Sequence, residues 1–193
     1  MRTERPNKAE LQACQGMTVE DLVPSHPRLL FVGINPGLWT AAVNAHFARP
    51  GNRFWPALHR AGITSRLVDA SLGLPEADRS ELVSKGIGIS NIVPIATARA
   101  DELSMAQLRT GGVELRALVA KRRPSVVAVL GVTAFRQAFG RRDLAIGRSD
   151  EEFEGAQLWV LPNPSGLNAH ETVDSLAHWY RSAAQSAGIE LPS

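Results

Sequence analysis

Four short apolar runs divide the chain into regular segments. They span residues 29–34, 87–93, 125–130 and 158–161. Each run is continuous rather than alternating, which is the pattern of a strand whose two faces are both buried. The runs therefore predict the inner strands of a sheet that is covered on both sides.

Helical patterns lie between and after these runs. We expect helices over residues 52–61, 104–121 and 171–186, the second of which opens on Ser104 as a typical N-cap. Strands that alternate with helices in this way indicate βαβ units. We predict an α/β fold, a three-layer sandwich with a central, mainly parallel sheet of four to five strands and helices on both faces.

The length of 193 residues fits a single domain. Residues 1–26 lack sustained periodicity, so we expect a solvated N-terminal lead-in followed by one domain over residues 27–193. The lead-in contains no apolar stretch typical of a signal peptide, and no run is long enough to span a bilayer. We therefore expect a cytoplasmic location and no membrane binding, and as a separate expectation the protein is a monomer.

Cysteine and charge narrow the possible chemistry. A single cysteine, Cys14, excludes a disulfide framework, a thiolate zinc site and a cysteine-ligated iron–sulfur cluster. No histidine pair has metal-site spacing, so we predict neither a metal nor a cofactor.

The net charge of +2 is weak evidence for nucleic acid, but arginine supplies 18 of the 21 basic residues. The excess of arginine over lysine is what forked, bidentate contacts with phosphates would use. A genome rich in G and C, in which arginine codons are common, explains it equally well.

Two loops stand out because each follows a predicted strand and contains an Asn-Pro turn. Parallel sheets bind ligands at the carboxyl ends of their strands, where these loops lie. Rigid turns of this kind present N–H groups and amide side chains to a ligand, although Asn-Pro and Pro-Gly are also ordinary turn formers. The candidate loop positions are Gly33, Pro36, Gly37, Asn163, Pro164 and Ser165.

Three motifs in this order resemble the mismatch-specific uracil- and thymine-DNA glycosylases, a branch of the uracil-DNA glycosylase superfamily. They are GINPG at 33–37, HFARPGNRFW at 46–55 and LPNPSGLN at 161–168, within a similarity that covers residues 28–182. The resemblance implies a monofunctional glycosylase of base excision repair that acts on nucleoid DNA. It would flip out uracil, or thymine or another damaged pyrimidine, opposite guanine, and leave an abasic site. The implied partner is double-stranded DNA containing G·U or related mismatches.

The resemblance also implies roles for individual residues in the base pocket. Asn35 would position the attacking water, which an amide can orient but cannot deprotonate as a strong base would. Phe47 would stack on the flipped base, and Asn91 would contact the base edge. The pocket would further include Ile34, Thr40 and His46.

A second group implied by the resemblance contacts the duplex. Leu167 would be the wedge that enters the base stack while the nucleotide is flipped. Gly166 and Asn168, on either side of it, would contact the widowed guanine, which favours mismatches with G. Two positions depart from the bacterial enzymes, because Trp39 and Thr40 replace small serines, so substrate range does not carry over.

Asp101 is the acid whose position makes it a candidate to supplement Asn35. A carboxylate near the reacting sugar would stabilise positive charge or activate water. Asp101 precedes Glu-Leu-Ser, however, which is equally a helix-start signal, and we favour that capping interpretation.

Two other functions are weighed against a glycosylase. A serine hydrolase would use Ser165 with His170 or His178, but the chain lacks the G-x-S-x-G nucleophile elbow around Ser165. A non-catalytic module that binds DNA lesions on the same fold stays open, because the presence of Asn35 does not prove turnover.

Overall fold

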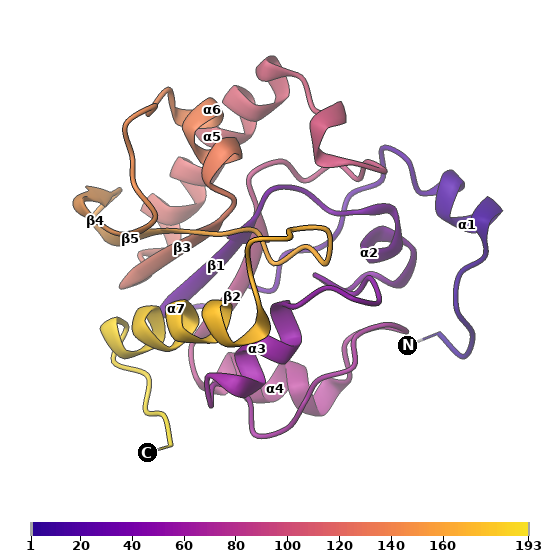
Figure 1. The fold of residues 1–193 in the computed structure, drawn as a ribbon, viewed down its shortest axis with the longest axis horizontal. Helices are drawn as coiled ribbons and strands as arrows, with labels where there is room; N and C mark the ends of the chain where they lie inside the picture. The colour runs from indigo at the N-terminus through magenta and orange to yellow at the C-terminus, as the bar shows by residue number, and fades with distance from the viewer. Residues whose placement is uncertain (1, 193) are drawn as a thin grey trace.

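The computed structural model describes residues 2–192, whose strands form one sheet in the order β2-β1-β3-β5-β4 (Figure 1). Adjacent strands are parallel except that β4 runs antiparallel to β5. The strands are β1 (Leu29–Gly33), β2 (Ile87–Asn91), β3 (Val126–Leu130), β4 (Gly147–Phe153) and β5 (Ala156–Leu161). This sheet confirms the predicted α/β fold.

Helices cover both faces of the sheet. In Figure 1, α3, α4 and α7 lie on one side and α5 and α6 on the other. The helices are α1 (Lys8–Ala13), α2 (Leu38–Val43), α3 (Phe54–Arg60), α4 (Glu76–Ser84), α5 (Met105–Arg122), α6 (Val132–Phe139) and α7 (Val173–Ser186), with a short 3-10 helix at Ala100–Glu102. None of the helices within residues 2–192 is both long and apolar enough to cross a membrane.

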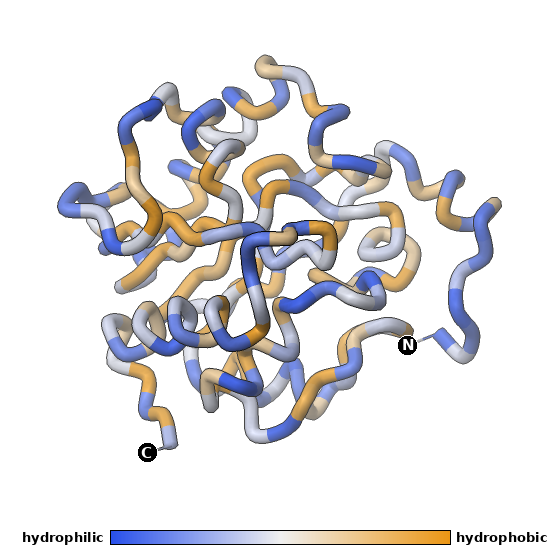
Figure 2. Tube along the Cα trace, viewed as in Figure 1, coloured by the Kyte–Doolittle hydropathy of each residue, from blue (hydrophilic) through white to orange (hydrophobic). Residues whose placement is uncertain are grey.

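The inner strands contribute to two cores through alternate side chains. Along β1, Leu29 and Phe31 pack in the cluster that contains α3 and α7, whereas Leu30 and Val32 pack in the cluster that contains α5 and α6. Successive strand residues point to opposite faces, so a strand that is buried on both sides is apolar at most successive positions. Figure 2 shows this as apolar colour along the central strands.

The three predicted helices are present with small changes in their ends. Ser104 caps α5 as expected, in a capping box with Gln107. Helix α7 begins at Val173 because Thr172 provides its N-cap. Gly111 lets α5 approach the end of β2, since a Cβ there would lie 2.1 Å from the backbone oxygen of Ile92.

The hydropathy pattern predicted neither the edge strand β4 nor the helices α1, α2, α4 and α6. Strand β4 is exposed along most of its length and carries acidic residues, so it has no continuous apolar run. Helix α2 has only six residues, too few for a periodic signal.

The N-terminal segment differs from the solvated lead-in that we expected for residues 1–26. Its described part contains α1 and buries the side chains of Cys14, Val19 and Leu22. Leu22 exchanges two backbone hydrogen bonds with Ile89, at 3.0 and 2.7 Å, on the outer edge of β2. The segment thereby covers a sheet edge that would otherwise present unpaired backbone groups.

Candidate active site

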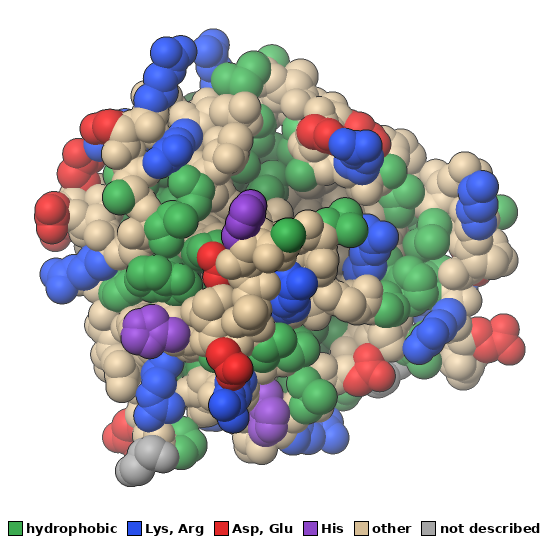
Figure 3. All heavy atoms as spheres, viewed as in Figure 1, with side chains coloured by type: hydrophobic (Ala, Val, Ile, Leu, Met, Phe, Trp, Pro, Cys, Tyr) green, Lys and Arg blue, Asp and Glu red, His purple; other side chains and the backbone are tan. Residues whose placement is uncertain are grey.

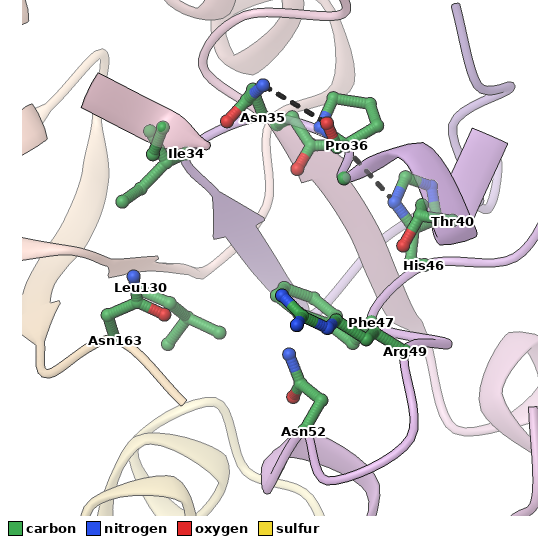
Figure 4. A pocket seen from close by; sticks show the side chains of 13 residues that line it. Ile34, Asn35, Pro36, Thr40, His46, Phe47, Arg49, Asn52, Leu130 and Asn163 are labelled. Carbon is green, nitrogen blue, oxygen red and sulfur yellow. Dashed lines mark hydrogen bonds between the residues drawn. The ribbon is translucent and has the colours of Figure 1, made fainter. Parts of the chain in front are cut away.

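A cavity of about 120 Å³ opens at the carboxyl ends of the parallel strands. Its lining includes Ile34 after β1, Asn91 at the end of β2, Leu130 at the end of β3 and Asn163 after β5 (Figure 4). The sheet order reverses beside β1, which is where open α/β sheets bind ligands. The cavity is smaller than the roughly 300–1,000 Å³ typical of drug-sized ligands, so it suits a small ring.

Asn35 lies at this cavity with its amide orientation set by hydrogen bonds. Its Nδ2 donates to the backbone oxygen of Ile95 at 3.0 Å and to Oγ1 of Thr97 at 2.7 Å. The hydroxyl of Thr97 in turn donates to the backbone oxygen of Arg99 at 2.7 Å, so its lone pairs face Asn35. The Nδ2 group therefore donates its hydrogen bonds within the protein, and Oδ1 is left as the acceptor for a bound molecule.

Phe47 forms one wall of the cavity and is held against a second aromatic ring. Its ring stacks on Phe54 with centroids 4.0 Å apart and planes 25° apart. Its φ of 54° lies in the left-handed region, which costs a non-glycine residue roughly 1–3 kcal/mol and persists only where the surroundings hold it. A Cβ on Gly33 would lie 3.0 Å from Cζ of Phe47 and 2.6 Å from Oδ1 of Asn91, so glycine at this position makes room for both side chains.

His46 connects the cavity to the N-terminal segment. One ring nitrogen, Nε2, lies 3.1 Å from the backbone oxygen of Glu20, and the other, Nδ1, lies 3.3 Å from Nδ2 of Asn91. A carbonyl only accepts, so Nε2 carries the proton and Nδ1 accepts from Asn91. Burial lowers the pKa of His46 to about 4, which keeps the ring neutral at physiological pH. His46 therefore orients the Asn91 amide.

The loop after β5 is held by Arg53. The guanidinium donates to the backbone oxygens of Ser165 at 3.1 Å, Asn168 at 2.8 Å and Gly166 at 3.3 Å. On the same loop, a Cβ at Gly166 would lie 2.5 Å from the backbone oxygen of Gly51. These contacts leave Leu167 as the outermost side chain, 81% exposed. Sequence reasoning did not assign Arg53 this role, although it stands inside the motif at 46–55.

The structure brings most of the candidate pocket residues together. Nine of them line the cavity: Ile34, Asn35, Pro36, Gly37, Thr40, His46, Phe47, Asn91 and Asn163. Trp39 does not line it, because its Nε1 donates to the backbone oxygen of Ser71 at 2.9 Å. The sequence analysis missed Arg49 and Asn52, which also contribute to the wall.

Asp101 lies outside the cavity. It belongs to the short 3-10 helix, and both of its carboxylate oxygens accept from the Arg99 guanidinium. Asp101 lies in the first turn of that 3-10 helix, in keeping with a helix-start signal, but it does not cap α5, whose N-cap is Ser104. No carboxylate contributes to the cavity wall within residues 2–192.

Neither a serine nucleophile nor a metal centre is assembled in the described chain. Oγ of Ser165 accepts from the backbone N–H of Leu167 at 3.3 Å, and no histidine hydrogen-bonds to it in residues 2–192. Over the same residues, no group of three His, Cys, Asp or Glu side chains is placed to hold a metal ion.

Comparison with known proteins identifies the family. The sequence profile of the Uracil DNA glycosylase superfamily matches residues 20–184. The chain belongs to this superfamily. Its fold is similar to the solution NMR structure of a proposed uracil DNA glycosylase from Methanosarcina acetivorans, with a TM-score of 0.62 over 91% of this chain and 98% of that one. At 14% identity that likeness concerns the fold alone.

Membership of the uracil DNA glycosylase superfamily confirms the resemblance at the level of the superfamily. It also agrees with the position of the cavity, because the profile match includes every residue that lines it. The assignment to the mismatch-specific branch stays a prediction, as do the roles of individual residues.

The burial of His46 predicts how the stability of this superfamily member depends on pH. The ordinary pKa of histidine is about 6.5, and the folded protein lowers it to about 4, so the unfolded chain binds the proton first as pH falls. The stabilisation is complete above pH 6.5 and is lost towards pH 4, by about 3 kcal/mol. Urea unfolding from pH 7 to pH 4 should show this loss in the wild type and a smaller one in His46→Gln.

His178→Gln provides the matched control, because His178 is exposed on α7. It should keep the wild-type dependence on pH. Identical slopes in the wild type and His46→Gln would contradict the burial account.

Proposed function

We propose that this protein is a monofunctional DNA glycosylase that removes uracil from G·U pairs in duplex DNA and leaves an abasic site. The proposal rests on the orientation of the Asn35 amide. Its Nδ2 donates hydrogen bonds within the protein, and its Oδ1 stays available as an acceptor at a cavity with an aromatic wall. An enzyme that acts on a base must first take it out of the stack and enclose it. A cavity of about 120 Å³ bounded by Phe47 suits one pyrimidine ring.

The exposed loop after β5 supports a role in flipping. Leu167 is held outwards by a loop whose backbone oxygens are bound by Arg53, so the side chain can enter a base stack without collapsing onto the protein. Next to it, the N–H of Gly166 donates to no acceptor within residues 2–192. A free N–H at this position suits the O6 acceptor of the guanine opposite the flipped base.

The chemical step follows from what the cavity contains. The bond between C1′ and the base breaks with its electron pair leaving on the base, and water adds to C1′ of the cationic sugar. Oδ1 of Asn35 orients that water by accepting one of its hydrogens, but an amide does not take the proton as a strong base would. Positioning and electrostatics therefore supply most of the catalysis.

The small positive charge of the chain limits its electrostatic attraction to DNA. The chain carries a net charge of +2, and Figure 3 shows basic and acidic side chains scattered over the visible face. We expect modest, salt-dependent affinity for undamaged DNA, with wedge insertion and base capture adding the preference for lesions.

Asn35→Ala should lower base release from a G·U duplex by about 100-fold or more, because the attacking water loses its positioning group. The assay uses end-labelled duplexes with G·U, A·U or G·T pairs and single-stranded DNA with uracil, followed by alkali. Wild-type protein should yield cleaved strands most rapidly from G·U. No cleavage of any substrate would overturn the proposal, and retained binding to an abasic duplex would then indicate a lesion-binding module.

Leu167→Ala should slow release from duplex DNA more than from single-stranded DNA, since only the duplex has a stack to fill. The readout is the ratio of the two rates under single-turnover conditions. Val113→Ala is the matched control, because Val113 is 69% exposed on α5 and should leave the ratio unchanged. Equal losses on both substrates in Leu167→Ala would remove the wedge assignment.

A further inference from the structure

Arg49 contributes to three neighbouring hollows at the candidate site. It lines the base cavity together with Asn35 and Phe47, and it also lines the neighbouring hollow beneath Leu167. Figure 4 shows its side chain reaching from the loop between α2 and α3 into the region of Phe47 and Asn52. The residue as a whole is exposed, so it contributes to the cavity from its solvent-facing rim.

The wall of the base cavity carries one formal charge. Among the described residues that line it, Arg49 alone is ionised, because the wall contains no carboxylate or lysine and burial keeps His46 neutral, with a pKa of about 4. An arginine stays protonated throughout the physiological range. The cavity is therefore positive even though the chain as a whole is nearly balanced.

The guanidinium of Arg49 has no acceptor of its own in residues 2–192. Other arginines nearby are engaged, since Arg53 binds three backbone oxygens and Arg99 pairs with Asp101. Arg49 takes part in no ion pair or side-chain hydrogen bond of the described chain. Its donors are available to a bound molecule.

We propose that Arg49 stabilises the negative charge that develops on the departing base. This inference rests on the proposed glycosylase function. When the C1′–N bond breaks, its electron pair moves onto the base, the sugar becomes cationic, and water adds to C1′ and releases a proton to solvent. A cation beside the base lowers the energy of that anion, as hydrogen-bond donors do in an oxyanion hole.

The position of Arg49 favours this role over a contact with a DNA phosphate. A phosphate contact would act from the outer hollow and contribute to binding, whereas the base cavity is the place where the new negative charge appears. A base that fills the cavity displaces water from it, and an unpaired cation interacts more strongly with an anion there than in open water. Removing Arg49 should therefore affect the bond-breaking step more than affinity.

The test compares Arg49→Gln and Arg49→Lys with wild type in single-turnover base release at saturating protein. One duplex carries uracil opposite guanine and the other carries 5-fluorouracil, which is a more acidic leaving group. We expect Arg49→Gln to slow uracil release by about 100-fold and 5-fluorouracil release clearly less, with partial recovery in Arg49→Lys. The affinity of Arg49→Gln for an abasic duplex should stay within about twofold of the wild-type value. If Arg49 instead contacted a DNA phosphate, that affinity should fall further.

Arg123→Gln is the matched control, since Arg123 is exposed after α5, at the amino-terminal edge of the sheet. It should behave as wild type in every assay, and thermal unfolding should show that all variants fold. The inference alone is overturned if wild type is active and Arg49→Gln slows the release of both bases equally. It is also overturned if Arg49→Gln leaves the rates unchanged while the slope of log K against log salt concentration falls in magnitude by about 1, as the loss of a phosphate contact predicts. Wild type that releases no base overturns the proposed function as well.

Discussion

The hydrogen bonds that hold the Asn35 amide determine what the site can do. They link the loop after β1 to the segment after β2, through the backbone oxygen of Ile95 and the hydroxyl of Thr97. Backbone bonds run in parallel with them, from Val93 N–H to the oxygen of Ile34 and from Thr97 N–H to the oxygen of Pro36. Because an amide has one donor end and one acceptor end, binding the first to the protein presents the second to the cavity.

The other walls of the cavity depend on close packing rather than on polar bonds. Gly33 leaves just enough space for Phe47 and Asn91 to meet beside β1, and any side chain at that position would displace one of them. Phe54 supports Phe47 from behind, and His46 orients Asn91. The result is a rigid recess whose only ionised lining residue, among those described, is Arg49. Such preorganised sites need little rearrangement as charge develops.

The buried strands could be predicted from sequence because burial leaves a pattern. Strands β1, β2, β3 and β5 are buried on both faces and were all predicted, whereas the exposed edge strand β4 has no continuous apolar run. The site was only partly predictable. Asn35 and Phe47 stand in recognisable motifs, but the roles of Arg49 and Arg53 depend on contacts with segments more than a hundred residues away or on the absence of other charges. The pairing of Asp101 with Arg99, outside the cavity lining, is likewise not visible in the sequence.

In the proposed reaction, base release relies on orientation and electrostatics, with no group in the cavity that gains or loses a proton near neutrality. The dependence of the single-turnover rate on pH tests this directly, on a G·U duplex with protein in saturating excess. We predict a rate that is flat from about pH 5.5 to pH 8.5, since burial places the pKa of His46 at about 4 and no carboxylate lines the described cavity. A rate that rises or falls tenfold per pH unit within this range would contradict the account, because it would reveal a catalytic acid or base.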